Sequence, residues 1–170
     1  EQNEADYDAL VCAWYGGQEG GRAVADVLSG KYNPSGRLPL TFYKSTDQLP
    51  DFLDYSMDGR TYRYMTEKPL YDFGYGLSYT TFEYEKPKLS SKKIANGKNV
   101  TLTVKVSNTG KMGGHEAVQV YVKRLNDEKA PVKALKGLKM IYLNPGETQT
   151  VKIELPASSF EYYDGYSDDL

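Results

Sequence analysis

Two arginines and two tyrosines lie within five residues of one another, at Arg60, Tyr62, Arg63 and Tyr64. Guanidinium groups donate several hydrogen bonds, and tyrosine rings offer flat apolar faces. Side chains of this kind bind hydroxyl groups and stack on sugar rings, so these four are the candidate substrate-binding residues. A second interpretation, which we favour, is that they fasten an extended segment to neighbouring domains.

Glu19 is the next residue whose position could serve catalysis, because glycine pairs flank it in residues 16–21, GGQEGG. It stands at the start of a predicted helix, where free N–H groups and the helix dipole stabilise an ionised carboxylate. A general acid must instead keep its proton near neutral pH. We therefore expect Glu19 to cap the helix. The glycines also match neither common nucleotide-binding fingerprint.

The single cysteine and the single histidine give little sign of a metal or redox site. Cys12 lies in an apolar run, where cysteine usually behaves as a small buried hydrophobic residue. His115 follows two glycines in a predicted loop and lacks the group of nearby Cys or carboxylate partners that a metal site needs. We expect no metal site and no cofactor.

Composition excludes two classes of partner. The 170 residues carry a formal net charge of -2, which gives no general electrostatic reason to bind nucleic acid. Hydrophobic residues make up 39% of the chain, and no apolar run approaches the roughly 20 residues that a membrane-spanning helix needs. We expect a globular protein with no membrane span.

The first 43 residues have the pattern of a β/α piece. Residues 9–15 form a nearly continuous apolar run, typical of a parallel strand that is covered on both faces. A helix is predicted over residues 20–29, and a short extended segment over residues 38–42. One strand and one helix cannot form a stable domain, because a parallel strand needs a neighbour and helices on both faces. We expect this piece to dock against further protein.

The remaining sequence changes from an aromatic arm to short strands. Residues 44–77 lack sustained periodicity but are too rich in tyrosine and phenylalanine for a disordered linker, so we predict an ordered arm. Beyond it, alternating apolar residues predict a β-sandwich. Its expected strands cover residues 81–85, 100–106, 117–122, 135–143, 148–155 and 160–163.

Several motifs, taken in order, resemble glycoside hydrolase family 3. Residues 13–21, 25–30 and 32–39 resemble the end of the family's second, α/β-sandwich domain, and residues 69–80 resemble its junction with the third domain. The fibronectin type III-like third domain is matched by residues 100–110, 116–123, 136–137 and 143–147.

The resemblance predicts a mostly β fold: an immunoglobulin-like sandwich preceded by the last β/α piece of the α/β-sandwich domain and a long ordered linker. The predicted parts are residues 1–43, the linker 44–77 and the sandwich 78–170. The chain reaches Leu170 before an expected final strand, so the sandwich is either trimmed or incomplete.

The resemblance also implies an activity. Retaining glycosidases use a nucleophilic carboxylate and a carboxylic acid/base, and the resemblance places both before Glu1, so we expect no catalytic residue in this chain. The parent protein would be a β-xylosidase or β-glucosidase, periplasmic or extracellular, that acts on the non-reducing ends of oligosaccharides. The expected partners are its upstream catalytic domains and the oligosaccharide.

A second function stays open, in which the sandwich is a non-catalytic module that binds carbohydrate or a protein partner. The two separate in a simple assay. Hydrolysis of a nitrophenyl glycoside by this chain alone would contradict the predicted place of the carboxylates. Binding of xylan or cellulose without turnover would favour the binding module.

Overall fold

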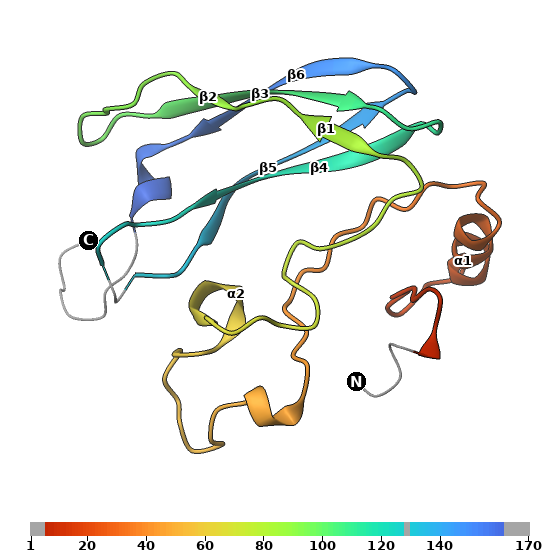
Figure 1. Cartoon of the computed structure of the whole chain (residues 1–170), viewed down its shortest axis with the longest axis horizontal. Coiled ribbons are helices and arrows are strands. Elements are labelled where there is room, and N and C mark those ends of the chain that lie inside the picture. The colour runs from red at the N-terminus through yellow and green to blue at the C-terminus, as the bar shows by residue number, and fades with distance from the viewer. Residues whose placement is uncertain (1–5, 128–129, 162–170) are drawn as a thin grey trace.

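The computed structural model describes residues 6–127 and 130–161, and its regular structure is mostly β (Figure 1). Within these ranges, six strands form two antiparallel sheets that lie one above the other (Figure 1). The larger sheet contains β1 (Phe82–Tyr84), β2 (Lys88–Leu89), β3 (Val100–Asn108) and β6 (Thr148–Leu155), and the smaller contains β4 (Gly114–Val122) and β5 (Ala134–Leu143).

Strand β3 organises the larger sheet. It pairs with β6 along one edge, from Val100 opposite Leu155 to Ser107 opposite Thr148, and with β1 and β2 along the other. In the smaller sheet, β4 and β5 pair over their whole lengths, with an irregularity between Val120 and Tyr121. The register therefore fixes which side chains face the space between the sheets.

The core lies between the two sheets and consists of aliphatic side chains from four strands. Val106 and Leu143 are fully buried, and Val151 is 1% exposed. Their neighbours along each strand are polar and face outward, because successive side chains in a strand alternate between faces. The remaining buried members of the core are Val100, Val104, Val118, Val120, Ile141, Ile153 and Leu155.

The segment before the sandwich contains short helices joined by extended chain. Helix α1 (Gly20–Leu28) lies where the sequence predicts it. A 3-10 turn, η2 (Thr46–Gln48), and a single helical turn, α2 (Thr61–Tyr64), interrupt the arm, and neither was predicted from the sequence. Another 3-10 turn, η3 (Ala157–Phe160), follows β6.

The predicted strand over residues 9–15 is wrong for this structure. These residues are exposed and pair with no strand among the residues that the structure describes. A parallel strand satisfies its N–H and C=O groups only through a neighbouring strand. The apolar pattern is therefore present without the partner that would make it a strand.

The expected strand over residues 160–163 also differs, since Phe160 ends η3 and residues 162 and 163 lie outside the described part of the chain. The mostly β fold and the sandwich are confirmed, and the division at residues 43 and 77 stays a prediction. Within the described ranges, no helix has both the length and the apolar character needed to cross a membrane.

Candidate functional site

Asn33 joins the first segment to the sandwich. Its side chain is almost completely buried, and its amide nitrogen donates a hydrogen bond of 3.1 Å to the carbonyl oxygen of Gly113, just before β4. Its amide oxygen accepts hydrogen bonds from the Ser78 hydroxyl at 2.9 Å and from the backbone N–H of Tyr79 at 2.8 Å. One side chain therefore holds three parts of the sequence together.

A buried ion pair lies nearby. Arg37 Nη2 is 2.6 Å from Glu116 Oε2, and the two side chains are only 14% and 11% exposed. The Tyr84 hydroxyl donates a hydrogen bond of 2.7 Å to Glu116 Oε1. The Glu116 carboxylate, on β4, is thus bound through both oxygens, by an arginine before the arm and a tyrosine on β1.

This environment changes the titration of Tyr84. Burial raises the pKa of its hydroxyl well above the ordinary value, and the hydrogen bond to the Glu116 carboxylate adds to the effect. Both causes act because an ionised tyrosine would lose hydration and face a second negative charge.

We expect Tyr84 to keep its proton in the folded chain at pH values where it ionises in the unfolded chain. Its contribution to folding is then complete below pH 10, the ordinary pKa, and is lost as the pH rises further. Burial also raises the pKa of Tyr121, so titration of tyrosine absorbance should show more than one hydroxyl failing to ionise in the folded wild type, and a Tyr84→Phe variant should reduce this difference from the unfolded chain by one. The same difference in a Tyr84→Phe variant would contradict the assignment.

A second contact holds the arm against β4. The Gln119 side-chain amide donates a hydrogen bond of 3.1 Å to the carbonyl oxygen of Gly74, and its oxygen accepts one of 2.6 Å from the Tyr121 hydroxyl. Gly74 has a φ of 81°, and a Cβ there would collide with Gln119 and Tyr121. The positive φ therefore favours glycine, and any larger residue would also displace the ends of the Gln119 and Tyr121 side chains from their hydrogen bonds.

The four predicted substrate-binding residues lie on or beside α2, and two of them have structural partners. The Tyr62 ring stacks on Phe73, with ring centroids 4.0 Å apart, and its hydroxyl accepts a hydrogen bond from the backbone N–H of Leu135. Arg60 donates hydrogen bonds to the carbonyl oxygens of Asp54 and Ser56. These contacts support the interpretation that the segment fastens the arm.

The other two residues, Arg63 and Tyr64, contact each other. The Arg63 guanidinium carbon lies 5.6 Å from the centre of the Tyr64 ring, in cation–π geometry. Arg63 Nε is buried and has no hydrogen-bond partner among the described residues. The carbonyl oxygen of Arg63 accepts a hydrogen bond of 2.6 Å from Val132 N–H. The hydrogen bond from Val132 thus holds the backbone of α2 in place, whereas the Arg63 guanidinium keeps one N–H group without a hydrogen-bond acceptor in the described part of the chain.

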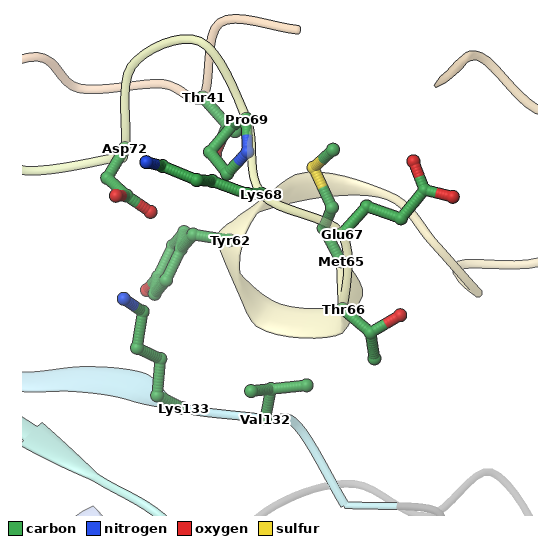
Figure 2. Close-up of a pocket in the computed structure, with 10 residues that line it drawn as sticks. All are labelled: Thr41, Tyr62, Met65, Thr66, Glu67, Lys68, Pro69, Asp72, Val132 and Lys133. Carbon is green, nitrogen blue, oxygen red and sulfur yellow. The ribbon is translucent and has the colours of Figure 1, made fainter. Parts of the chain in front are cut away.

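An open pocket of about 260 Å³ lies between α2, the arm and the chain entering β5, and Tyr62 is one of its walls (Figure 2). The side chains of Lys68, Asp72 and Lys133 gather at the Tyr62 end of this pocket, whereas Glu67 points away (Figure 2). Thr41 also lines it, and its hydroxyl oxygen is buried without a hydrogen-bond partner among the described residues. The pocket thus combines an aromatic wall with donors and an acceptor of hydrogen bonds.

The structure does not bring the four residues to one pocket. Tyr62 lines the pocket of Figure 2, and Arg63 lines a smaller one of about 40 Å³, whereas Arg60 and Tyr64 line neither. The contacts of Asn33, Arg37 and Glu116 were not predicted from the sequence. The available signal was a charged residue, Glu116, at the start of an apolar strand.

Glu19 and Cys12 both differ from what the sequence predicts. Glu19 occupies the N-cap position of α1, but its side chain makes no capping hydrogen bond and lies 3.8 Å from Arg22 in an exposed pair. The expectation of a side-chain cap is therefore wrong, because the backbone at Glu19 is not in the extended conformation that directs a cap. Cys12 is exposed, contrary to the expected burial, and no part of the described chain covers the apolar run around it.

His115 packs edge-on against the ring of Tyr142, its partner across β4 and β5. Among residues 6–127 and 130–161, no three His, Cys, Asp or Glu side chains are grouped as a metal site would require. Within these residues, polar side chains gather at two places. One is the junction between the first segment and the sandwich, formed by Asn33, Arg37 and Glu116, and the other is the pocket beside α2.

Comparison with known domain families assigns the two sides of this junction to two different domains. Residues 1–79, which include Asn33, Arg37 and α2, match the glycosyl hydrolase family 3 C-terminal domain. Residues 116–170, which begin at Glu116, match the fibronectin type III-like domain. The chain belongs to glycoside hydrolase family 3. The ion pair between Arg37 and Glu116 therefore joins the two matched parts of this family 3 chain.

Two curated relatives are enzymes by name. The Xylan 1,4-beta-xylosidase of Xylanibacter ruminicola is 48% identical over 157 residues, which cover 92% of the family 3 chain and 18% of that protein. The Periplasmic beta-glucosidase of Salmonella typhimurium is 41% identical over 169 residues, which cover 92% of the chain and 22% of that protein. The chain thus spans about one fifth of the length of these relatives.

Solved structures agree with the family. The structure of beta-glucosidase 3B from Thermotoga neapolitana in complex with glucose has a TM-score of 0.79 and 38% sequence identity to the chain. The match covers 89% of the family 3 chain and 23% of that structure. The arrangement of arm and sandwich therefore recurs within a longer protein.

Proposed function

We propose that this chain is part of a retaining exo-β-glycosidase that releases xylose or glucose from the non-reducing ends of oligosaccharides. The observation that carries the proposal is the 48% identity over 92% of the chain with a protein named Xylan 1,4-beta-xylosidase. The 41% identity with a protein named Periplasmic beta-glucosidase supports the same reaction on a second sugar, and supports a periplasmic or extracellular location.

Within that enzyme, we propose that the chain stabilises the fold and shapes the site while other domains supply the catalytic carboxylates. A retaining glycosidase needs two carboxyl groups roughly 5 Å apart, flanking the glycosidic bond. The most buried carboxylate among the described residues, Glu116, is already bound by Arg37 and Tyr84. It is therefore unavailable as a nucleophile or a proton donor.

The partner of this chain would be the catalytic part of the same protein. Large apolar side chains in the first segment are exposed, among them Leu10, Val11, Trp14 and Leu28. Contiguous exposed apolar residues usually mark a surface that another protein surface covers. Residues 9–15 would also gain the neighbouring strand that they lack here.

An activity assay tests this function. We expect the chain alone to release no nitrophenol from nitrophenyl β-xyloside or β-glucoside, and a longer protein carrying it to release nitrophenol with retained anomeric configuration. Hydrolysis by the chain alone would contradict the proposed division of roles. Binding of xylan without hydrolysis by either protein would favour the non-catalytic binding module.

We also propose that Arg60, Tyr62, Arg63 and Tyr64 contact the oligosaccharide, Tyr62 from the wall of the pocket beside α2 and the other three from outside that pocket. Support comes from the pocket wall formed by Tyr62 and from the partly unsatisfied guanidinium of Arg63. In the longer protein, Tyr64→Ala should raise KM about two- to tenfold with kcat unchanged, as expected for the loss of one aromatic contact. Tyr55→Ala, an exposed tyrosine in the same arm, is the matched control. Equal kinetics for both variants would leave these residues with only an anchoring role.

A further inference from the structure

The basic residues of this chain are unevenly distributed. Residues 86–105 contain six of the 21 lysines and arginines and none of the 23 aspartates and glutamates. This segment runs from the end of β1 through β2 and into β3. A chain whose overall charge is -2 therefore has a strongly positive region on one sheet.

The sheet register places two lysines in one row. Lys88 on β2 and Lys152 on β6 both lie opposite Thr103 on β3. Residues directly opposite each other in an antiparallel sheet share a face, and the adjacent Val104, Val151 and Ile153 face the core. Lys88, Thr103 and Lys152 therefore lie across the outer face of the sheet, with the two lysine backbones about 10 Å apart.

Further lysines extend the positive charge along the same part of the sandwich. We define the lysine face as six exposed lysines of β2, β6 and the chain next to β2: Lys86, Lys88, Lys92, Lys93, Lys98 and Lys152. Lys92, Lys93 and Lys98 belong to the connection between β2 and β3, which follows Lys88. The positive charge is thus spread over a surface rather than gathered in a cavity.

The acidic groups beside these lysines are otherwise engaged. Glu154 lies opposite Thr101 on the same outer face, and its carboxylate accepts a hydrogen bond of 2.6 Å from Asn99. Glu85 pairs with Lys105 at 3.4 Å. No ion pair is found for the six lysines among the residues that the structure describes. Their ammonium groups are therefore available to an external anion.

We propose that the lysine face binds a polysaccharide whose sugars carry carboxylate groups. Ammonium groups attract carboxylates without demanding a fixed geometry, and the hydroxyls of Thr101, Thr103 and Ser90 add hydrogen-bonding groups to the same surface. A flat, charged surface suits an extended polyanion better than a single neutral sugar, which needs a cavity and an aromatic wall. The choice of a polysaccharide rests on the proposed glycosidase function.

A lipid surface fits these residues less well. Leu89 and Ile94 are the exposed large apolar side chains of residues 86–105, and Leu89 pairs with Leu102, which packs against the core. Ile94 alone offers little apolar area for insertion into a membrane. Anionic vesicles nevertheless belong in the test as a competing ligand.

The test is affinity electrophoresis of the full chain in gels that contain polygalacturonate or unsubstituted xylan. We expect retardation by polygalacturonate that disappears at high salt, because salt screens exposed charges. The Lys88→Glu/Lys152→Glu variant should bind at least about tenfold more weakly. Lys111→Glu/Lys139→Glu makes the same change in charge away from the lysine face and should bind like wild type.

Three results would overturn the proposal: equal retardation of wild type and the Lys88→Glu/Lys152→Glu variant, equal weakening of both variants, or stronger binding to anionic vesicles than to polygalacturonate. If these lysines only prevent the edge of the sheet from pairing with a second copy of the chain, wild type and this variant would be retarded equally, and the variant would dimerise. The assay measures binding and not hydrolysis, so a failed glycosidase assay and a failed retardation assay are separate outcomes.

Discussion

Replacing Arg37 with alanine is expected to lower the free energy of unfolding by about 3 to 5 kcal/mol. The substitution leaves the Glu116 carboxylate, 11% exposed, with only the Tyr84 hydroxyl as a side-chain partner. An uncompensated buried charge costs far more than a lost surface contact. Urea unfolding followed by circular dichroism measures the change.

The matched control is Arg22→Ala, which removes an arginine from the exposed pair with Glu19. We expect this control to cost about 0.5 kcal/mol or less. The double variant Arg37→Met/Glu116→Leu should recover part of the loss, because the buried charge is gone while the Tyr84 hydroxyl stays unpaired. Equal effects of Arg37→Ala and Arg22→Ala would show that the buried pair does not stabilise the junction.

Asn108→Ala is expected to cost about 3 to 4 kcal/mol of unfolding free energy. Asn108, 1% exposed, closes the turn between β3 and β4. Its nitrogen donates hydrogen bonds of 2.8 and 3.0 Å to the carbonyl oxygens of Met112 and Leu143, and its oxygen accepts hydrogen bonds from Thr80 and Gly110. Alanine would leave these groups buried without partners.

The control for this prediction is Asn144→Ala, because Asn144 is exposed and bonds to Glu147 in a surface turn. We expect it to cost less than about 1 kcal/mol, since water replaces the lost hydrogen bond. Urea unfolding of both variants gives the comparison. If Asn108→Ala unfolds at the same urea concentration as wild type, the buried amide does not carry this part of the fold.

The strands of the sandwich could be predicted because each carries its own pattern. Val100, Val104 and Val106 alternate with polar residues, and this alternation alone places one face of β3 toward a core. Helix α1 was predictable in the same way, since Gly30, with a φ of 73°, lies just beyond its end.

The strand expected over residues 9–15 failed for the opposite reason. An apolar run indicates that a segment is suited to burial, but a strand forms only when another strand supplies its hydrogen bonds. No such neighbour is present among the described residues, and Trp14 is instead 54% exposed. The local sequence shows that this segment needs a neighbouring strand, but it does not show where that strand comes from.

The candidate site was only partly predictable. The aromatic and cationic character of α2 is plain in the sequence, but the stack of Tyr62 on Phe73 depends on how the arm folds back on itself. Arg37 and Glu116 lie 79 residues apart, so no local pattern connects them. Contacts of this kind become visible only once the sandwich fixes the place of β4.

The buried pair at the junction sets a condition on any exchange of domains between related enzymes. A sandwich transplanted from residue 78 onward would carry Glu116 and Tyr84 without the guanidinium that neutralises them, and the donor protein would keep Arg37 without its carboxylate. The piece that can be inherited or recombined intact is therefore the sandwich together with the turn from Asn33 to Arg37, whatever its apparent boundary in sequence.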